Sequence, residues 1–120
     1  MKALLVDPST RRIHEIQYTG DVSTIHALRD ITEFGSEEFN EQRDVVVSDH
    51  QGAVNGTGER LGYFRIAPGH EPIAGLALII GTATNGAAAA PNIKLNELLD
   101  SVEFLTSINV DERHFQCAAV

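Results

Sequence analysis

The stretch GHEPIAGLALIIGTATNG, residues 69–86, carries the strongest structural signal in the chain. Its middle part, residues 75–82, is a short run of aliphatic and small residues, which has the length and composition of a buried strand. Pro72 prevents a helix immediately before this run, so residues 68–72 are expected to form a loop. We therefore predict a loop that leads into a strand of the hydrophobic core.

Other runs of aliphatic and β-branched residues occur along the chain and are separated by turn-forming residues. They predict an N-terminal hairpin around Asp7 and Pro8 and a second hairpin around residues 40–42. The expected strands cover residues 2–7, 12–18, 33–39, 43–49, 62–66 and 102–105, the last as an edge strand. Residues 52–60, with three glycines, and residues 84–91 are expected to be irregular.

Two segments have the apolar spacing of amphipathic helices. Apolar residues recur at intervals of three over residues 21–31, and Asp21 stands where a helix N-cap is expected. A second, shorter pattern covers residues 93–102, with Asn92 in the capping position. The first helix is expected to pack on the sheet, and the pattern leaves open whether the second packs on the same face.

Together these elements predict a single α+β domain over residues 1–105. We expect a mostly antiparallel sheet of five or six strands with one or two helices packed on one face. Residues 106–120 have weak periodicity and are expected to be a C-terminal tail, extended or ordered by a partner. An exposed edge strand would allow a homodimer. The predicted core contains Leu4, Val6, Ile25, Leu28, Val45, Val47, Phe64, Leu76, Leu78 and Ile80.

The charge of the chain is strongly negative, with seventeen Asp and Glu against nine Lys and Arg and a formal net charge of −8. This balance argues against nucleic acid as a direct partner and favours a basic protein surface. No apolar run approaches the roughly 20 residues of a membrane helix, so no membrane association is expected. Cys117 is the only cysteine, which excludes an internal disulfide and favours the cytoplasm.

The glycines at positions 81 and 86 have the spacing of a phosphate-binding loop, but Ala87 and Ala88 occupy the places of its lysine and hydroxyl residue. We therefore expect a turn after the strand, and no cofactor. A nucleotide-like small molecule remains the alternative hypothesis. Its candidate binding residues are His70, Glu71, Gly81, Thr82, Asn85 and Gly86.

His70 and Glu71 are adjacent, which is not the spacing of a zinc site, because a second histidine would be needed at the position of Ala74. No metal site is predicted. His70 is interpreted in one of two ways. It is either a solvated loop residue without a function, or part of a general acid–base pair with Glu71 that the fold assembles. No other catalytic motif occurs, so we expect a protein that is not an enzyme.

Acidic residues are concentrated in the second predicted hairpin, where Arg43 is the only opposing charge over residues 33–49. They form either a solvated face that keeps an edge strand from pairing, or a surface that docks on a basic patch of another protein. The candidate partner-binding residues are Glu33, Glu37, Glu38, Glu41 and Asp44.

Several segments, taken in order, resemble a family of small phage and prophage proteins that is classed as a domain of unknown function. These segments are MKALLVDPSTRRIHEIQY (1–18), DVSTIHALRDITEF (21–34), DVVVSDHQG (44–52), PIAGLALIIGT (72–82) and IKLNELLDSVEFL (93–105). The most specific match is the P-x-A-G-x-x-L-x-x-G-T pattern between Pro72 and Thr82. Family members tend to have an acidic turn where this chain has residues 83–86.

The resemblance implies an origin in a phage or prophage, and it brings no catalytic residues with it. Small acidic phage proteins often act on host proteins, for instance by blocking a defence complex. Together with the acidic hairpin and the missing catalytic motifs, this favours an accessory protein that binds a protein of the bacterial host through its acidic surface and counters a host defence complex. Such a protein would act in the cytoplasm of the host.

Overall fold

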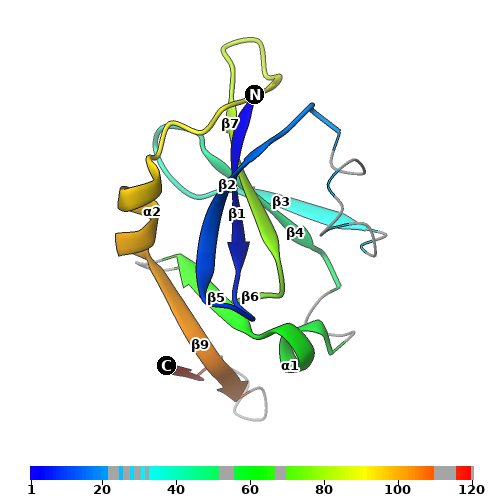
Figure 1. The fold of residues 1–120 in the computed structure, drawn as a ribbon, viewed down its shortest axis with the longest axis vertical. Coiled ribbons are helices and arrows are strands. Elements are labelled where there is room, and N and C mark those ends of the chain that lie inside the picture. Colours follow the sequence, from blue (N-terminus) through cyan, green and yellow to red (C-terminus); the bar gives the residue numbers. More distant parts are fainter. Residues whose placement is uncertain are drawn as a thin grey trace.

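The computed structural model describes residues 1–21, 25, 28, 31, 33–51, 56–66, 70–109 and 116–119, and for residues 58, 106–109 and 116–119 it describes the backbone. Two antiparallel sheets and two short helices make up this part of the chain (Figure 1). The larger sheet contains β1 (Lys2–Asp7), β2 (Arg12–Gln17), β3 (Phe34–Glu38), β4 (Val45–Asp49), β7 (Ala77–Thr82) and β8 (Ala88–Ala89). The smaller sheet contains β5 (Tyr63–Ile66), β6 (Ile73–Ala74), β9 (Val102–Asn109) and β10 (Gln116–Ala119). The helices are α1 (Thr57–Leu61) and α2 (Leu95–Ser101).

Strand β7 lies at the centre of the larger sheet, whose order is β2-β1-β7-β4-β3 with β8 paired to β7. Leu78 is opposite Leu5 of β1 on one side and Val47 of β4 on the other. Ala77, Leu78 and Ile79 have no exposed surface, so β7 is buried on both of its faces. This explains why its sequence is a continuous apolar run rather than an alternation, and it confirms the predicted core strand.

The side chains of the larger sheet divide into two core clusters, one on each face, because successive residues of a strand point to opposite sides. The first core cluster contains Leu4, Val6, Ile13, Val46, Phe64, Ile66, Ala77, Ile79 and Leu98. The second core cluster contains Ala3, Leu5, Tyr18, Ile25, Leu28, Val47 and Leu78. The first face is therefore covered by the smaller sheet and α2. The second is covered by the segment that carries Ile25 and Leu28.

The α+β class and a helix packed on one face are confirmed. The predicted helix at residues 21–31 lies mostly outside the described residues. Within it, the Leu28 N–H donates to the Ile25 carbonyl at 2.9 Å and the Ile31 N–H to the Leu28 carbonyl at 3.1 Å. Ile25 and Leu28 are buried as predicted.

The predicted core was incomplete, because it included the residues on only one face of each strand. Strands β4 and β7 bury side chains on both faces. Val45, Leu76 and Ile80 are half-buried at the margin of the second core cluster. Val46 and Ile79, which alternate with them, are buried in the first core cluster and were not predicted.

The predicted loop at residues 52–60 was wrong for its last part, where α1 begins at Thr57. Helix α1 packs on the turn between β6 and β7. Gly75 has φ +77° in this turn, and a Cβ there would lie 2.6 Å from Thr57 Cγ2. The close approach of Thr57 therefore requires glycine at position 75.

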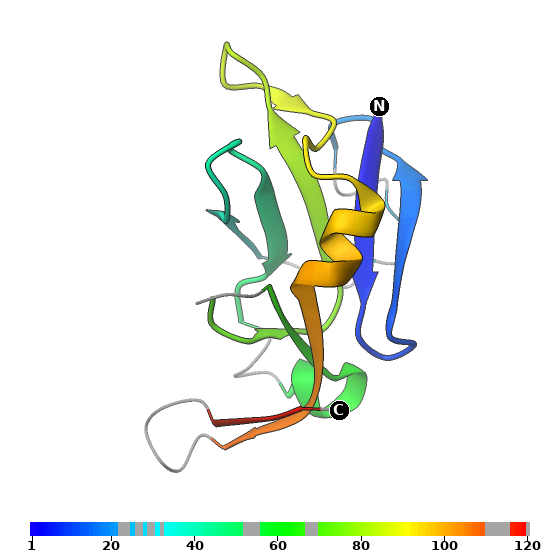
Figure 2. The same cartoon turned by 90° about the vertical axis from the view of Figure 1, so that its left-hand side faces the viewer.

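The helix at the C-terminal end also differs in detail from its prediction. Its N-cap is Lys94 rather than Asn92, and the Lys94 N–H donates to the Glu97 carboxylate at 3.0 Å. Helix α2 passes directly into β9, which leads from the larger sheet to the smaller one (Figure 2). Strand β9 extends past residue 105 to Asn109 and lies between β5 and β10, so it is not an edge strand.

An acidic groove beside an edge strand as candidate functional site

The acidic residues of strand β3 point to opposite sides of the sheet. Glu37 is opposite Val46, which belongs to the first core cluster, and Glu38 is opposite Val45, which packs against the second. Residues directly opposite each other in an antiparallel pair share a face. The predicted acidic surface therefore separates into two parts.

On the side of the second core cluster, Glu38 forms an ion pair with Arg43 at 3.4 Å. Both side chains are 54% exposed, so the pair contributes little to stability, roughly 0–1 kcal/mol. Glu33 and Glu41 are exposed near the two ends of β3. Neither contacts the groove described below.

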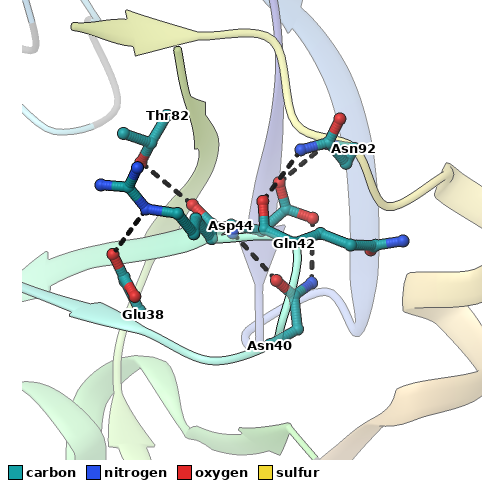
Figure 3. Close-up of polar contacts among 7 residues, drawn as sticks. Glu38, Asn40, Gln42, Asp44, Thr82 and Asn92 are labelled. Atoms are coloured by element: carbon teal, nitrogen blue, oxygen red, sulfur yellow. Dashed lines mark hydrogen bonds and ion pairs between the residues drawn. The ribbon is translucent and has the colours of Figure 1, made fainter. Parts of the chain in front are cut away.

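Asp44 is buried and structural, which corrects its prediction as a surface residue (Figure 3). Its Oδ1 accepts a hydrogen bond from the Asn92 N–H at 2.7 Å, and its Oδ2 accepts one from the Ile93 N–H at 2.8 Å. The Asn40 side-chain amide donates to Oδ2 at 2.9 Å, and the Asp44 N–H donates to the Asn40 Oδ1 at 2.9 Å. These bonds compensate for the burial of the carboxylate. A residue used in this way is not available to a partner.

Further hydrogen bonds hold the same turn against neighbouring segments. The Asn92 side-chain amide donates to the Gln42 carbonyl at 3.0 Å, and the Thr82 hydroxyl donates to the Arg43 carbonyl at 3.0 Å (Figure 3). The turn between β3 and β4 is therefore fixed to both β7 and the segment before α2.

On the side of the first core cluster, β3, β4 and residues 71–74 enclose an open groove of about 480 Å³. Among the described residues that line it, three are acidic, namely Glu37, Asp49 and Glu71, and none is Lys or Arg. His50 also lines it, and a Cβ on Gly35 would lie 3.1 Å from the His50 Nδ1. The groove thus presents negative charge around a space large enough for a long side chain.

The three carboxylates differ in how far their hydrogen-bonding capacity is used. Asp49 Oδ1 accepts from the Gln51 N–H at 3.0 Å, and its Oδ2 lies 3.5 Å from the Thr57 hydroxyl. Glu37 and Glu71 are exposed, and within the described part of the chain neither has a hydrogen-bond or ion-pair partner. These two are therefore the groups that could pair with a ligand.

His70 holds the segment that carries Glu71 against the end of the β3–β4 hairpin. Its Nε2 lies 3.2 Å from the Phe39 carbonyl, so the tautomer with a proton on Nε2 would donate there. Its ring meets the Phe39 ring edge-on, with centroids 6.4 Å apart and an interplanar angle of 84°. His70 thus positions the groove wall, and it is not among the residues that line the groove.

The predicted turn after β7 is confirmed, and its polar groups bond to each other. The Ala83 N–H donates to the Ala87 carbonyl at 2.8 Å, and the Gly86 N–H donates to the Ala83 carbonyl at 2.9 Å. The Asn85 Oδ1 accepts from the Ala87 N–H at 3.0 Å, and Gly86 has φ +87°.

The structure does not bring the candidate ligand-binding residues together at the groove. Glu71 lines it, whereas Gly81, Thr82, Asn85 and Gly86 do not. Gly81 is required for packing, because a Cβ there would collide with the carbonyl oxygen of Ala90.

His50 was not predicted as a neighbour of Glu37, although the turn at residues 40–42 contained the signal. Counting back from this turn pairs Glu37 with Val46, so Ser48 and His50, every second residue that follows along the chain, share its face. Asp49 is opposite Phe34, so its place at the groove does not follow from this pairing. The approach of residues 71–74 could not be foreseen in this way, because it depends on the smaller sheet.

Among the described residues, no group of three or more His, Cys, Asp and Glu side chains is placed to hold a metal ion. No helix in this part of the chain is long and apolar enough to cross a membrane. Comparison with protein-family models, with curated proteins and with solved structures finds no match to this chain.

Proposed function

We propose that this chain is a non-enzymatic protein-binding module whose acidic groove receives a basic side chain of a partner protein. The observation that carries the proposal is the lining of the groove, where the described residues include Glu37, Asp49 and Glu71 and no Lys or Arg. The net charge of −8 adds a long-range attraction to basic surfaces.

The chemistry of such a contact is electrostatic and partly exposed to solvent. Glu37 and Glu71 are open to water, so their attraction for a cation is screened by salt. Affinity and association rate should both fall as the ionic strength rises.

The narrower form of the proposal concerns the partner. The resemblance to small phage and prophage proteins supports an accessory protein that binds a protein of the bacterial host and blocks a defence complex. On this hypothesis the protein acts in the host cytoplasm.

The test is affinity capture from bacterial lysate at low and at moderate salt, with two charge-reversal variants. Glu37→Lys with Glu71→Lys reverses the two free carboxylates of the groove. Glu33→Lys with Glu41→Lys changes the net charge equally at exposed sites away from it. We expect a protein that the wild type and the second variant capture at low salt and the first variant does not.

Two outcomes would contradict the proposal. Equal loss of capture in both variants would assign the effect to overall charge and not to the groove. Capture that both variants retain would remove the acidic groove from the interaction.

A further inference from the structure

The hydrogen-bond pattern of the β3–β4 hairpin shows which backbone groups of β3 point away from the sheet. The Phe39 N–H donates to the Asp44 carbonyl at one end, and the His50 N–H donates to the Glu33 carbonyl at the other, both at 3.0 Å. In an antiparallel pair, hydrogen-bonded and non-hydrogen-bonded positions alternate. The odd-numbered residues from Glu33 to Phe39 therefore bond to β4.

It follows that Phe34, Ser36 and Glu38 direct their N–H and C=O groups to the outer side of β3. Strand β3 is the last strand in the order of the larger sheet, so no described strand pairs with this side. Three residues thus present both a donor and an acceptor along an open edge.

The open edge and the acidic groove are adjacent. Gly35 and Glu37 stand between the residues whose backbone groups point outward. Both line the groove, together with residues 71–74. A strand added beside β3 would lie about 4.8 Å away and would turn every second side chain toward this face. One such side chain would then stand next to Glu37.

The charge of β3 decides which kind of strand can pair with this edge, a second copy of β3 or a basic segment of another protein. Two copies of β3 paired antiparallel about Glu37 would set the two Glu37 side chains directly opposite each other. Pairing about Ser36 would put Glu37 opposite Gly35, but it would still gather four carboxylates on one two-stranded ribbon whose strands contain no Lys or Arg. Like charges opposite each other destabilise a strand pair. An extended segment with Lys or Arg at alternate positions would meet Glu37 and Glu71 as counter-charges instead.

We propose that the outer edge of β3 binds an extended basic segment of the partner protein by strand addition. Main-chain hydrogen bonds form with Phe34, Ser36 and Glu38, and a Lys or Arg of the segment reaches into the groove toward Glu37 and Glu71. This inference rests on the proposed function, since it specifies how the same groove recognises its partner.

The first experiment follows backbone amide exchange by NMR with a short capped peptide of alternating valine and lysine as the probe. Alternation places all its lysines on one face when it is extended. We expect exchange to slow at Phe34, Ser36 and Glu38 and to stay unchanged at Gly35 and Glu37, which already bond to β4. Strand addition would be overturned if the peptide bound without slowing exchange selectively at Phe34, Ser36 and Glu38. It would also be overturned if the peptide did not bind at all. A peptide with the same residues in two blocks is the matched control.

The second experiment compares substitutions on β3 by peptide titration. Ser36→Pro removes an outward N–H, and an edge strand tolerates proline where its N–H faces away from the sheet. We expect about tenfold weaker binding for Ser36→Pro, and wild-type affinity for Ser36→Ala, which keeps the N–H. Unchanged affinity in a folded Ser36→Pro variant would contradict the proposal.

A charge comparison tests the groove without relying on proline. Glu37→Gln should weaken peptide binding several-fold, whereas Glu38→Gln, on the other face of the same strand, should change it much less. Equal effects of the two substitutions would count against entry of a lysine into the groove.

Failure of this inference can be separated from failure of the proposed function. If Ser36→Pro still captures the lysate protein that Glu37→Lys with Glu71→Lys loses, the groove binds a partner without strand addition. If the wild type captures nothing and the peptide does not bind, both proposals are wrong.

Discussion

Asp44 and Glu37 lie on the same hairpin and have the same kind of charge, yet their surroundings are opposite. Asp44 is completely buried and accepts hydrogen bonds from two backbone N–H groups and one side-chain amide. Glu37 is exposed on the wall of a groove and has no partner among the described residues. The role of a carboxylate on this hairpin is therefore decided by the hydrogen-bond donors that the fold brings to it. Position in an acidic stretch of sequence does not decide it.

The largest effect should come from a buried carboxylate without donors. Leu78→Asp would place a charge at a fully buried site between Leu5 and Val47. Because no hydrogen-bond donors replace its lost hydration, we expect the variant to be unfolded. Circular dichroism and thermal melting measure this directly. A variant with the wild-type spectrum and melting temperature would show that a buried carboxylate is tolerated here without hydrogen-bond donors. The donors of Asp44 would then not explain why it can be buried.

A smaller loss is expected when the buried carboxylate is removed and its donors remain. Asp44→Ala should destabilise the protein by about 2–4 kcal/mol, because the Asn92 and Ile93 N–H groups lose their acceptor. Glu37→Ala is the matched control and should change stability by less than about 0.5 kcal/mol. Urea unfolding gives both values. Similar losses for the two variants would invalidate the comparison.

The segment that Asp44 holds can also be disturbed from its other side. Gly81→Ala would push a Cβ against the backbone of Ala90 and Pro91, and should cost about 1–3 kcal/mol. At Gly86, φ is +87° but the space around it is open, so Gly86→Ala should cost only about 1 kcal/mol. If urea unfolding ranks the two glycines in the reverse order, the close approach at Gly81 does not limit stability.

Tyrosines extend the comparison to groups that are neutral when buried. Burial raises the pKa of Tyr63 and the nearby charge of Glu59 raises it further, and burial followed by Asp21 raises the pKa of Tyr18. A pKa that is higher in the folded state adds stability that is fully present below about pH 10 and is lost as the pH rises through the folded value. Tyr63→Phe should therefore lose less stability than the wild type between pH 8 and pH 11. Equal losses in urea unfolding at these two pH values would refute the assignment to Tyr63.

The elements that sequence analysis predicted well are those encoded by local patterns. The two hairpins and β7 follow from runs of apolar residues between turn-forming residues, and they are present in the larger sheet. Helix α1 was missed because its glycine-rich sequence is typical of loops. It is stabilised there by its contact with Gly75, which is distant in the sequence.

The candidate site was predicted in part. Glu37 and Glu71 were singled out, one for each of two separate hypotheses, and the fold places both on the same groove. The role of Asp44 could not be predicted, because its donors at Asn92 and Ile93 come from a segment that only the completed sheet brings near. The opposite directions of Glu37 and Glu38 could have been inferred from the pairing of β3 with β4.

The central position of β7 has a consequence for the order of events during synthesis. Strands β1 and β4 are joined in the sheet only through β7, which is made after both. The two N-terminal hairpins thus leave the ribosome before the strand that unites them, with their apolar faces still uncovered. We expect the larger sheet to form late and through contacts of high sequence separation, which slow folding. Until then the nascent chain would depend on the solubility that its carboxylates provide.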